Sequence, residues 1–272
     1  MDKKPLTIEE IHEGTLVILK KIIEICDKIN VNYFIAYGTL IGAVRHKGFI
    51  PWDDDLDIIM LRPEYEKFVS YCDEHEKDLC PFKLMNRFNT PGYPFNISRF
   101  NDLRYRMETK GYPDAGMGMF IDIYPFDGCG KKSNNMFFTN IRKKFYSTLL
   151  FLSYLKKFHR SQKGLIRTFL KFPVYCIAQL LGMDFILDQL DKLQFKYRLD
   201  ESDVVGLMTW DTYVIPYDKE FFKDLTYLEF EGIKVKAPLF YDCILKQEYG
   251  NYMELPPEES RVPHHEYILF KK

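Results

Sequence analysis

The chain has few features of a secreted, disulfide-stabilised or zinc-binding protein. Its 272 residues include six cysteines, and no two of them form a C-x-x-C pair. The cysteines are scattered through apolar segments, which is typical of reduced core thiols rather than of a disulfide framework or a zinc ribbon. The N-terminus, Met1–Pro5, leads into Glu9 and Glu10, where a signal peptide would have an apolar stretch. We therefore expect a cytoplasmic protein.

Long hydrophobic runs are also missing. The longest uncharged stretch near the middle of the chain, Phe172–Met183, is too short to span a bilayer as a helix and contains Pro173. We therefore predict neither an integral membrane protein nor a secreted one.

Several catalytic and binding motifs are absent as well. The sequence has no Walker loop, no G-x-G-x-x-G and no Ser/His/Asp nucleophile elbow. The acids between Asp53 and Glu64 fall at EF-hand loop positions, but Ile58 stands where that loop needs glycine for its sharp turn. We therefore do not expect a calcium sensor.

The net charge of -1 conceals a segregation of charge along the chain. Residues 131–200 contain fourteen Lys/Arg and four Asp/Glu, so this segment carries +10 and the remainder carries -11. Its composition predicts basic helices, which can lie on an anionic lipid surface or hold a polyanionic acceptor; a solvated helical subdomain explains the same pattern. No nucleic-acid-binding motif accompanies the charge, so we expect no nucleic-acid partner.

A row of aspartates is the most distinctive feature that the sequence does contain. Asp53, Asp55 and Asp57 alternate by two, so they project from one face if the segment is extended, and Asp54 then faces away and is not a ligand. The apolar run Leu56–Leu61 around Asp57 predicts that the acids open a buried strand. Hard oxygen ligands in this arrangement favour Mg²⁺ or Mn²⁺. A solvated acidic turn is the alternative.

Two further segments accompany the aspartates. Gly118–Phe126 has the pattern of a buried strand with one acid, Asp122, which needs a partner or a metal. Asp122 is therefore a candidate third carboxylate for the site of Asp55 and Asp57; a structural aspartate bonded to backbone amides is the alternative. Gly38–Thr39 turns the chain into a brief helix, and backbone N–H groups at such a turn form an anion site.

Periodicity predicts the elements around these residues. Thr7 and Glu10 form a capping box that opens a helix ending near Asn30, with His12 at its surface or boundary. We also expect strands at 31–37, 82–88 and 95–105, helices at 62–72 and 239–249 with Ala237–Pro238 as a helix start, a hairpin at 227–235 and an extended tail that includes His264 and His265, whose role stays open. Arg87, Arg99, Arg104 and Arg106 gather in this region and could bind phosphates, but strand arginines are more often solvated, and we expect this of the four.

These elements predict an α+β protein with a mixed β-sheet core flanked by helices and an inserted basic helical subdomain. The length suits one catalytic core with a large insertion. We expect residues 1–130 to form a nucleotidyltransferase-like catalytic core, 131–203 the basic helical insertion, and 204–272 a C-terminal segment that completes the core.

The layout of Gly38–Thr39, of Asp55-Leu56-Asp57-Ile58 and of Asp122 on a later strand resembles the nucleotidyltransferase fold. More narrowly, the chain is similar to the LicD family of phosphocholine transferases, which is related to fukutin-type ribitol-phosphate transferases. The stretches that carry this similarity are 37–46, 50–58, 120–125 and 227–232 through His264-His265. The resemblance covers nearly the whole chain, and the basic middle is its least specific part.

The resemblance implies transfer of phosphocholine from the donor CDP-choline to a sugar hydroxyl of a bacterial surface glycan, with CMP leaving. The acceptor would be a teichoic-acid or lipo-oligosaccharide precursor, as a free glycan or a lipid-linked oligosaccharide. Two Mg²⁺ or Mn²⁺ ions would be held by Asp53, Asp55, Asp57 and Asp122, which fits the residue chemistry. The expected catalytic residues are Asp55, Asp57 and Asp122, with Asp122 as the general base.

Four more residues receive roles from the same resemblance. Gly38 and Thr39 would seat a phosphate through backbone N–H groups, and Arg45 would counter charge on the leaving nucleotide. Trp52 beside the acids is the leading candidate for an aromatic cage around the quaternary ammonium. Alternatively, Trp52 only braces the loop, since a buried tryptophan is ordinarily a packing residue.

Other functions fit the same residues. A transferase that uses CDP-ribitol or CDP-glycerol would have the same metal site. A non-catalytic nucleotide- or glycan-binding member of a membrane assembly is a third possibility, although such a module has no need for three carboxylates around a metal. A peripheral contact with the inner face of the plasma membrane would explain the +10 segment.

Overall fold

The computed structural model describes residues 4–109, 111–155, 158, 165–208, 213–263 and 267–272. His264 and His265 lie outside these ranges. The helices are α1 (Ile8–Lys28), α2 (Tyr37–His46), α3 (Arg62–Glu74), α4 (Phe137–Tyr154), α5 (Leu165–Leu181), α6 (Met183–Gln194), α7 (Tyr241–Tyr249) and the 3-10 turns η1 (Lys219–Phe222) and η2 (Glu258–Ser260). The strands are β1 (Phe34–Ile35), β2 (Asp57–Leu61), β3 (Phe82–Met85), β4 (Ser98–Asp102), β5 (Tyr105–Thr109), β6 (Met119–Gly128), β7 (Val204–Gly206), β8 (Tyr217–Asp218), β9 (Leu225–Phe230), β10 (Ile233–Pro238) and β11 (Tyr267–Lys271).

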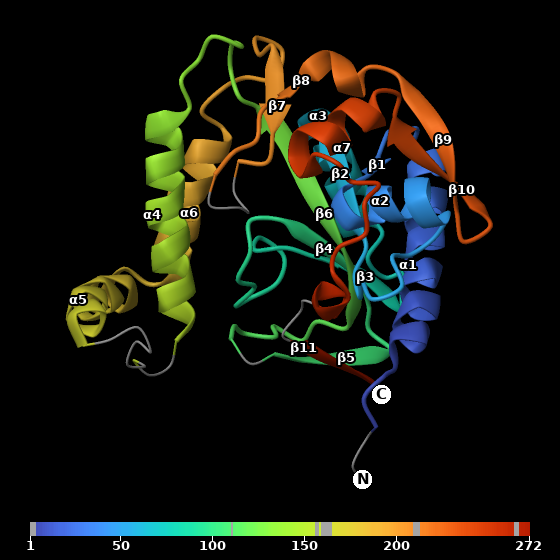
Figure 1. Ribbon diagram of the computed structural model, residues 1–272. Helices are drawn as coiled ribbons and strands as arrows, with labels where there is room; N and C mark the ends of the chain where they lie inside the picture. Colours follow the sequence, from blue (N-terminus) through green and yellow to red (C-terminus); the bar gives the residue numbers. More distant parts are fainter. Residues whose placement is uncertain (1–3, 110, 156–157, 159–164, 209–212, 264–266) are drawn as a thin grey trace.

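A mixed sheet forms the core of the molecule (Figure 1). Its strand order is β1-β2-β6-β4-β3, and β7 pairs with β6 and with β8. β2 and β6 run parallel, in a register that places Asp57 beside Asp122, whereas the other strand pairs of this sheet are antiparallel. The α+β class and the mixed sheet predicted from the sequence are confirmed.

Helices cover the two faces of this sheet. On one face α3 packs on β4, where Phe68 and Phe100 bring their ring centroids to 6.0 Å. On the other face Tyr37, at the start of α2, packs edge-on against Tyr124 of β6 at 5.4 Å. Because side chains alternate along a strand, Asp122 lies on the same face as Tyr124. Asp57, the register partner of Asp122, shares this face, so both aspartates point toward the α2 side.

Several predicted elements are confirmed. The capping box forms, since the Thr7 N–H donates to Glu10 Oε2 at 2.8 Å and the Glu10 N–H donates to Thr7 Oγ1 at 3.3 Å. The hairpin β9–β10 forms across residues 225–238. The last long helix, α7, ends at Gly250, which adopts a positive φ of 65° that glycine tolerates better than other residues.

Other boundaries were wrong. Of the strand expected at 95–105, only β4 forms within that range, and β5 begins at its last residue, Tyr105; the strand expected at 31–37 is confined to β1. Ala237 and Pro238 do not start a helix but end β10, where they pair with Thr226 and Leu225. A proline can end a strand of a two-stranded ribbon because little of the hydrogen-bond ladder is lost there.

The insertion predicted at 131–203 contains α4, α5 and α6, which stand beside the sheet (Figure 1). They share a small apolar cluster of Leu149, Leu152, Ala178 and Ile186. The division of the chain into 1–130, 131–203 and 204–272 stays a prediction. Within the described ranges, no helix is both long enough and apolar enough to cross a membrane.

Candidate active site

The acidic loop that precedes β2 is fixed through its backbone. A His12 ring nitrogen of α1 is 2.7 Å from the Asp53 carbonyl oxygen, and the Tyr267 hydroxyl donates to the Asp54 carbonyl at 3.2 Å. The Asp57 N–H donates to Thr39 Oγ1 at 2.8 Å. Backbone groups of the loop and of Asp57 make these three contacts.

The carboxylates of Asp53, Asp54 and Asp55 converge. Each offers an oxygen, and these oxygens lie within 4.8 Å of one another, a spacing at which they could hold a metal ion. The expectation that Asp54 faces away is wrong, because β2 begins only at Asp57 and the alternation of a strand does not apply before it.

Asp57 and Asp122 lie side by side behind this group. They are register partners on the parallel strands β2 and β6, and both are buried. Asp57 Oδ1 has no hydrogen-bond partner among the described residues. Burial raises the pKa of Asp57 well above its usual value, and the charges of Asp55, Asp122 and Asp53 raise it further. A cation would relieve this accumulation of negative charge.

Arg99 of β4 compensates the charge of Asp122. Its Nε donates to Asp122 Oδ1 at 2.7 Å, and both side chains are buried. The guanidinium lies 4.3 Å from the centroid of the Phe95 ring and 3.9 Å from that of Phe120. Burial alone would lower the pKa of Arg99, but the Asp122 carboxylate raises it above its usual value. The Tyr124 hydroxyl donates to Asp122 Oδ2 at 3.4 Å.

Gly38 and Thr39 lie in the first turn of α2. A Cβ atom added to Gly38 would be 2.4 Å from Asp53 Oδ2, so glycine is what allows this carboxylate to approach the helix N-terminus. The backbone N–H groups of a first helical turn have no intrahelical acceptors and favour negative charge. In this structure Asp53 lies beside that anion-favouring position, while the Thr39 hydroxyl orders the start of β2.

Gly38, Arg45, Trp52 and Asp53 line one open pocket of about 690 Å³, whose opposite wall is the segment 249–257. Arg45 fixes that wall, because its Nη1 donates to the carbonyls of Tyr252 at 2.9 Å and Glu254 at 3.3 Å. Burial and the nearby charge of Arg261 lower the pKa of Arg45. These four residues, to which the sequence analysis gives roles in binding phosphate, choline or metal, thus line the same pocket.

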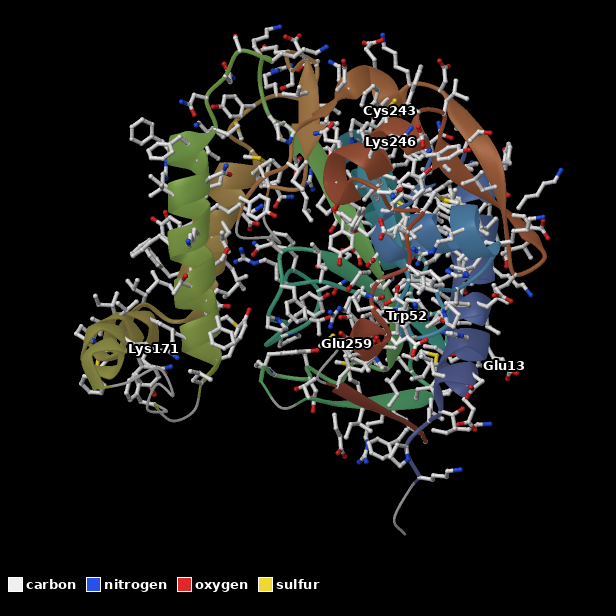
Figure 2. The ribbon with its side chains drawn as sticks, viewed as in Figure 1. Glu13, Trp52, Lys171, Cys243, Lys246 and Glu259 are labelled. Carbon is white, nitrogen blue, oxygen red and sulfur yellow. The ribbon has the colours of Figure 1, made fainter. Side chains whose placement is uncertain are left out.

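Trp52 already contacts a cation. The guanidinium carbon of Arg261 lies 5.6 Å from the centroid of the Trp52 ring, within the range of a cation–π contact. Arg261 directly follows η2, and Figure 2 shows Trp52 close to Glu259 of this turn. The Trp52 ring therefore presents a face at which a cation can lie.

Comparison with known proteins places the chain in a family. The family profile described as "LicD/FKTN/FKRP, nucleotidyltransferase domain" matches residues 30–162. The lipopolysaccharide cholinephosphotransferase LicD of Haemophilus influenzae is 31% identical over 268 residues, which cover 96% of this chain and 97% of that protein. The chain belongs to the LicD family. It is accordingly an enzyme of the phosphotransferase class.

Shorter similarities extend to two rickettsial proteins. RP689 of Rickettsia prowazekii is 35% identical over 82 residues, which cover 30% of this chain and 26% of that protein. RT0683 of Rickettsia typhi is 46% identical over 92 residues, which cover 34% of this chain and 23% of that protein. Over almost its whole length, therefore, the chain is similar to the Haemophilus LicD protein, whereas the rickettsial similarities are partial.

The LicD-family profile covers only part of the site. It includes the acidic loop and Asp122, but the pocket wall at 249–257 lies beyond residue 162. The alignment with the Haemophilus protein spans both parts. The segment 249–257 thus lies within the alignment with the Haemophilus protein, although it lies outside the family profile.

Sequence reasoning missed several residues of this site. His12 is half-buried, as its expected surface or boundary position implies, but its contacts were not expected: it stacks on Phe49 with ring centroids 3.9 Å apart and contacts the acidic loop. Arg99 was expected in solvent and is buried. Arg261 and Tyr267 reach the site from the C-terminal segment. Arg99 left a sign in the sequence, because it lies inside a predicted strand between the apolar residues Ile97 and Phe100.

Proposed function

We propose that this chain transfers phosphocholine from CDP-choline to a sugar hydroxyl of a cell-surface glycan precursor, on a nucleotidyltransferase-like fold, and releases CMP. Nearly full-length similarity to a lipopolysaccharide cholinephosphotransferase supports this proposal. The observation that carries it is the convergence of the carboxylates of Asp53, Asp54 and Asp55 beside a pocket that Arg45 and Trp52 line. A teichoic acid or a lipo-oligosaccharide is the proposed acceptor class.

The donor set fits Mg²⁺ or Mn²⁺. Carboxylate oxygens are the hard ligands that these ions prefer, and the Asp57 carboxylate supplies a buried oxygen beside the converging group. We propose that Asp53, Asp55, Asp57 and Asp122 hold two ions, with Asp54 as an additional candidate. When bound, such ions neutralise diphosphate charge and polarise the attacking hydroxyl.

The proposed reaction is a displacement at phosphorus. The acceptor hydroxyl oxygen forms a bond to the phosphorus of phosphocholine while the bond from that phosphorus to the CMP oxygen breaks. The electron pair of the broken bond leaves with CMP, and the hydroxyl proton passes to the Asp122 carboxylate. Arg99 Nε donates to Oδ1 of that carboxylate at 2.7 Å, whereas Oδ2 has only longer contacts, with Arg99 Nη2 at 3.5 Å and the Tyr124 hydroxyl at 3.4 Å, so Oδ2 is the proposed proton acceptor. A fixed base in this position contributes through general base catalysis.

The pocket favours a donor with a cationic head group. Trp52 presents an aromatic face that already accepts the Arg261 guanidinium, and a quaternary ammonium is attracted to such a face in the same way. Ribitol and glycerol carry no charge and would gain nothing from this ring. Arg45 and the N-terminus of α2 at Gly38 lie in the same pocket and would receive the phosphates.

Release of CMP from a panel of donors tests the proposal. We expect the purified chain with Mg²⁺ and an acceptor glycan to release CMP from CDP-choline and to lose this activity with EDTA. Release from CDP-ribitol or CDP-glycerol instead would reassign the donor. Absence of CMP release from every donor, with EDTA making no difference, would contradict the catalytic proposal and leave a nucleotide- or glycan-binding role.

A further inference from the structure

The segment around α4 and α5 carries charge of one sign only. From Gly128 to Met183 the sequence contains eleven Lys and Arg residues and no Asp or Glu over 56 residues. The acids of the insertion begin with α6, where Asp188 and Asp191 pair with Arg87 of the core. A one-signed segment of this length indicates an anionic partner.

The same segment exposes large apolar side chains. Phe137, Phe138, Ile141 and Phe145 of α4 are between 50% and 74% exposed. Positions 137, 141 and 145 follow one another at intervals of four, so these side chains form one stripe along the helix. The buried residue Thr139 lies on the opposite side of the helix. The stripe is unusual, because a solvated helix normally presents charged or polar side chains there.

Helix α5 also exposes apolar side chains. Phe172 and Ile177 are about half exposed, and Leu180 is 87% exposed. Leu149 and Leu152 of α4 pack against α5 in the cluster described above, which holds the two helices together. Both helices stand on the side of the molecule away from β9 and β10 (Figure 1), and Lys171 marks α5 in Figure 2. We call the exposed stripe of α4 together with Phe172, Ile177 and Leu180 the α4–α5 surface.

Of the three cationic residues of α4, one is buried and two are exposed. Lys143 is fully buried, and its Nζ donates to the carbonyls of Leu207 at 2.8 Å and Tyr213 at 3.2 Å. Its neighbours Arg142 and Lys144 are exposed. They flank the apolar stripe on the helix surface, so cationic and apolar groups alternate around one face.

We propose that the α4–α5 surface docks on an anionic lipid bilayer. Aromatic and aliphatic side chains of an interfacial helix enter the boundary between headgroups and acyl chains, while its lysines and arginines bind anionic headgroups. A second copy of the chain would bring two surfaces of the same charge together, which Coulomb repulsion opposes. A nucleic acid would match the charge but would leave the aliphatic Ile141, Ile177 and Leu180 in water. This inference does not rest on the proposed reaction.

Vesicle flotation of the full chain tests the proposal. We expect binding to mixed phosphatidylcholine/phosphatidylglycerol vesicles that weakens with salt, and little binding to pure phosphatidylcholine. Phe138→Ser/Ile141→Ser/Phe145→Ser is expected to reduce binding about tenfold or more, since it removes the inserted apolar area. Arg142→Glu/Lys144→Glu is expected to reduce binding by a similar factor. These positions are exposed, so circular dichroism and the melting temperature should stay unchanged.

Matched variants elsewhere provide the controls. Tyr227→Ser/Leu239→Ser removes exposed apolar side chains near β9 and β10, and Lys77→Glu/Lys234→Glu reverses two exposed cations away from α4 and α5. Both should bind vesicles like the unmodified chain. Equal loss in the controls, or no binding to anionic vesicles, would overturn the proposal. It would also be overturned if the triple serine variant abolished a dimer seen by light scattering while no variant altered vesicle binding.

Discussion

Arg99 and Asp122 form a buried ion pair across β4 and β6, with Arg99 Nε 2.7 Å from Asp122 Oδ1. The two residues are register partners, so the pairing of the strands itself brings them together. Asp122 is at the same time the register partner of Asp57 on its other side. The Arg99 guanidinium thus pairs with Asp122 at the buried end of a row of carboxylates. At the other end of this row, the carboxylate oxygens of Asp53, Asp54 and Asp55 converge and could hold a metal ion.

Removal of Arg99 should destabilise the protein strongly. Arg99→Leu leaves the Asp122 carboxylate buried without its partner, and breaking a buried ion pair in this way costs about 3–5 kcal/mol. The double variant Arg99→Leu/Asp122→Asn should recover part of this loss. Urea unfolding of the single variants Arg99→Leu and Asp122→Asn and of the double variant measures the coupling. A coupling energy near zero would show that the pair is not energetically linked.

The sequence could predict those features of the site that depend on neighbouring residues in the chain, and not those that depend on the pairing of distant strands. The aspartates of the acidic loop and the strand around Asp122 were identified from short patterns. The pairing of Asp57 with Asp122 depends on the order β2-β6-β4, which no local pattern specifies. Arg99 could therefore not be assigned to Asp122, because its position opposite that residue is known only from the register.

The C-terminal wall of the pocket shows the same limit. Arg45 and the carbonyl of Tyr252 are separated by 207 positions in the chain, and they meet because α2 and α7 pack together. Asp54 illustrates a different cause. Strand alternation was assumed from Asp53 onward, whereas β2 begins only at Asp57. The side chain of Asp54 was therefore assigned to the wrong direction.

Substitution of Gly38 should separate activity from stability. The Cβ of Gly38→Ala would meet Asp53 Oδ2 at 2.4 Å, and the flexible carboxylate can move away at little cost. Alanine favours a helix over glycine by about 0.5–1 kcal/mol, so the melting temperature should not fall. Displacement of Asp53 should lower turnover about tenfold or more if one metal contact weakens. Gly111→Ala, where an added Cβ meets nothing within 4 Å, should leave both activity and stability unchanged.

Divalent metal should stabilise the protein through the acidic loop and Asp57. Mg²⁺ or Mn²⁺ at about 100 times its dissociation constant adds about 2.7 kcal/mol to the free energy of unfolding, which scanning calorimetry detects as a higher melting temperature. Asp55→Asn and Asp57→Asn should lose this shift and all turnover. Without metal, Asp57→Asn should be more stable than the unmodified chain, because it removes one of several neighbouring buried charges.

The exposed Asp224 provides the control for this experiment. Asp224→Asn should keep the metal-dependent shift, and EDTA should reverse the shift in both the variant and the unmodified chain. A metal-dependent rise in melting temperature that survives in Asp57→Asn, or turnover that persists in Asp55→Asn, would mean that the metal lies elsewhere.

Trp52 should contribute to the affinity for CDP-choline and not to that for CDP-glycerol. A cation–π contact is worth about 0.5–2 kcal/mol, so Trp52→Leu should weaken CDP-choline binding about twofold to thirtyfold. Trp52→Phe retains an aromatic face and should show a smaller loss. Isothermal titration of both donors measures the difference. An equal loss for the two donors would assign Trp52 to packing of the loop rather than to the choline group.

The Arg62–Asp127 pair predicts a pH dependence of stability at the other end of β6. Arg62 Nε and Nη2 donate to the two Asp127 oxygens, both at 2.7 Å. Burial nevertheless raises the pKa of Asp127 from 3.8 to about 6, because the cost of desolvation exceeds the stabilisation by Arg62. The folded protein therefore holds this proton more tightly than the unfolded chain does, and the associated stability is present below pH 3.8 and lost as the pH rises to about 6.

Comparison with Asp127→Asn isolates this contribution, since position 127 then has no proton to release. Relative to the variant, the free energy of unfolding of the unmodified chain should fall by about 2.4 kcal/mol between pH 4 and pH 7, which is most of the full effect of about 1.4 kcal/mol for each unit of pKa difference. Urea unfolding at both pH values measures it. A difference between the two proteins that does not change with pH would show that Arg62 compensates the Asp127 charge fully.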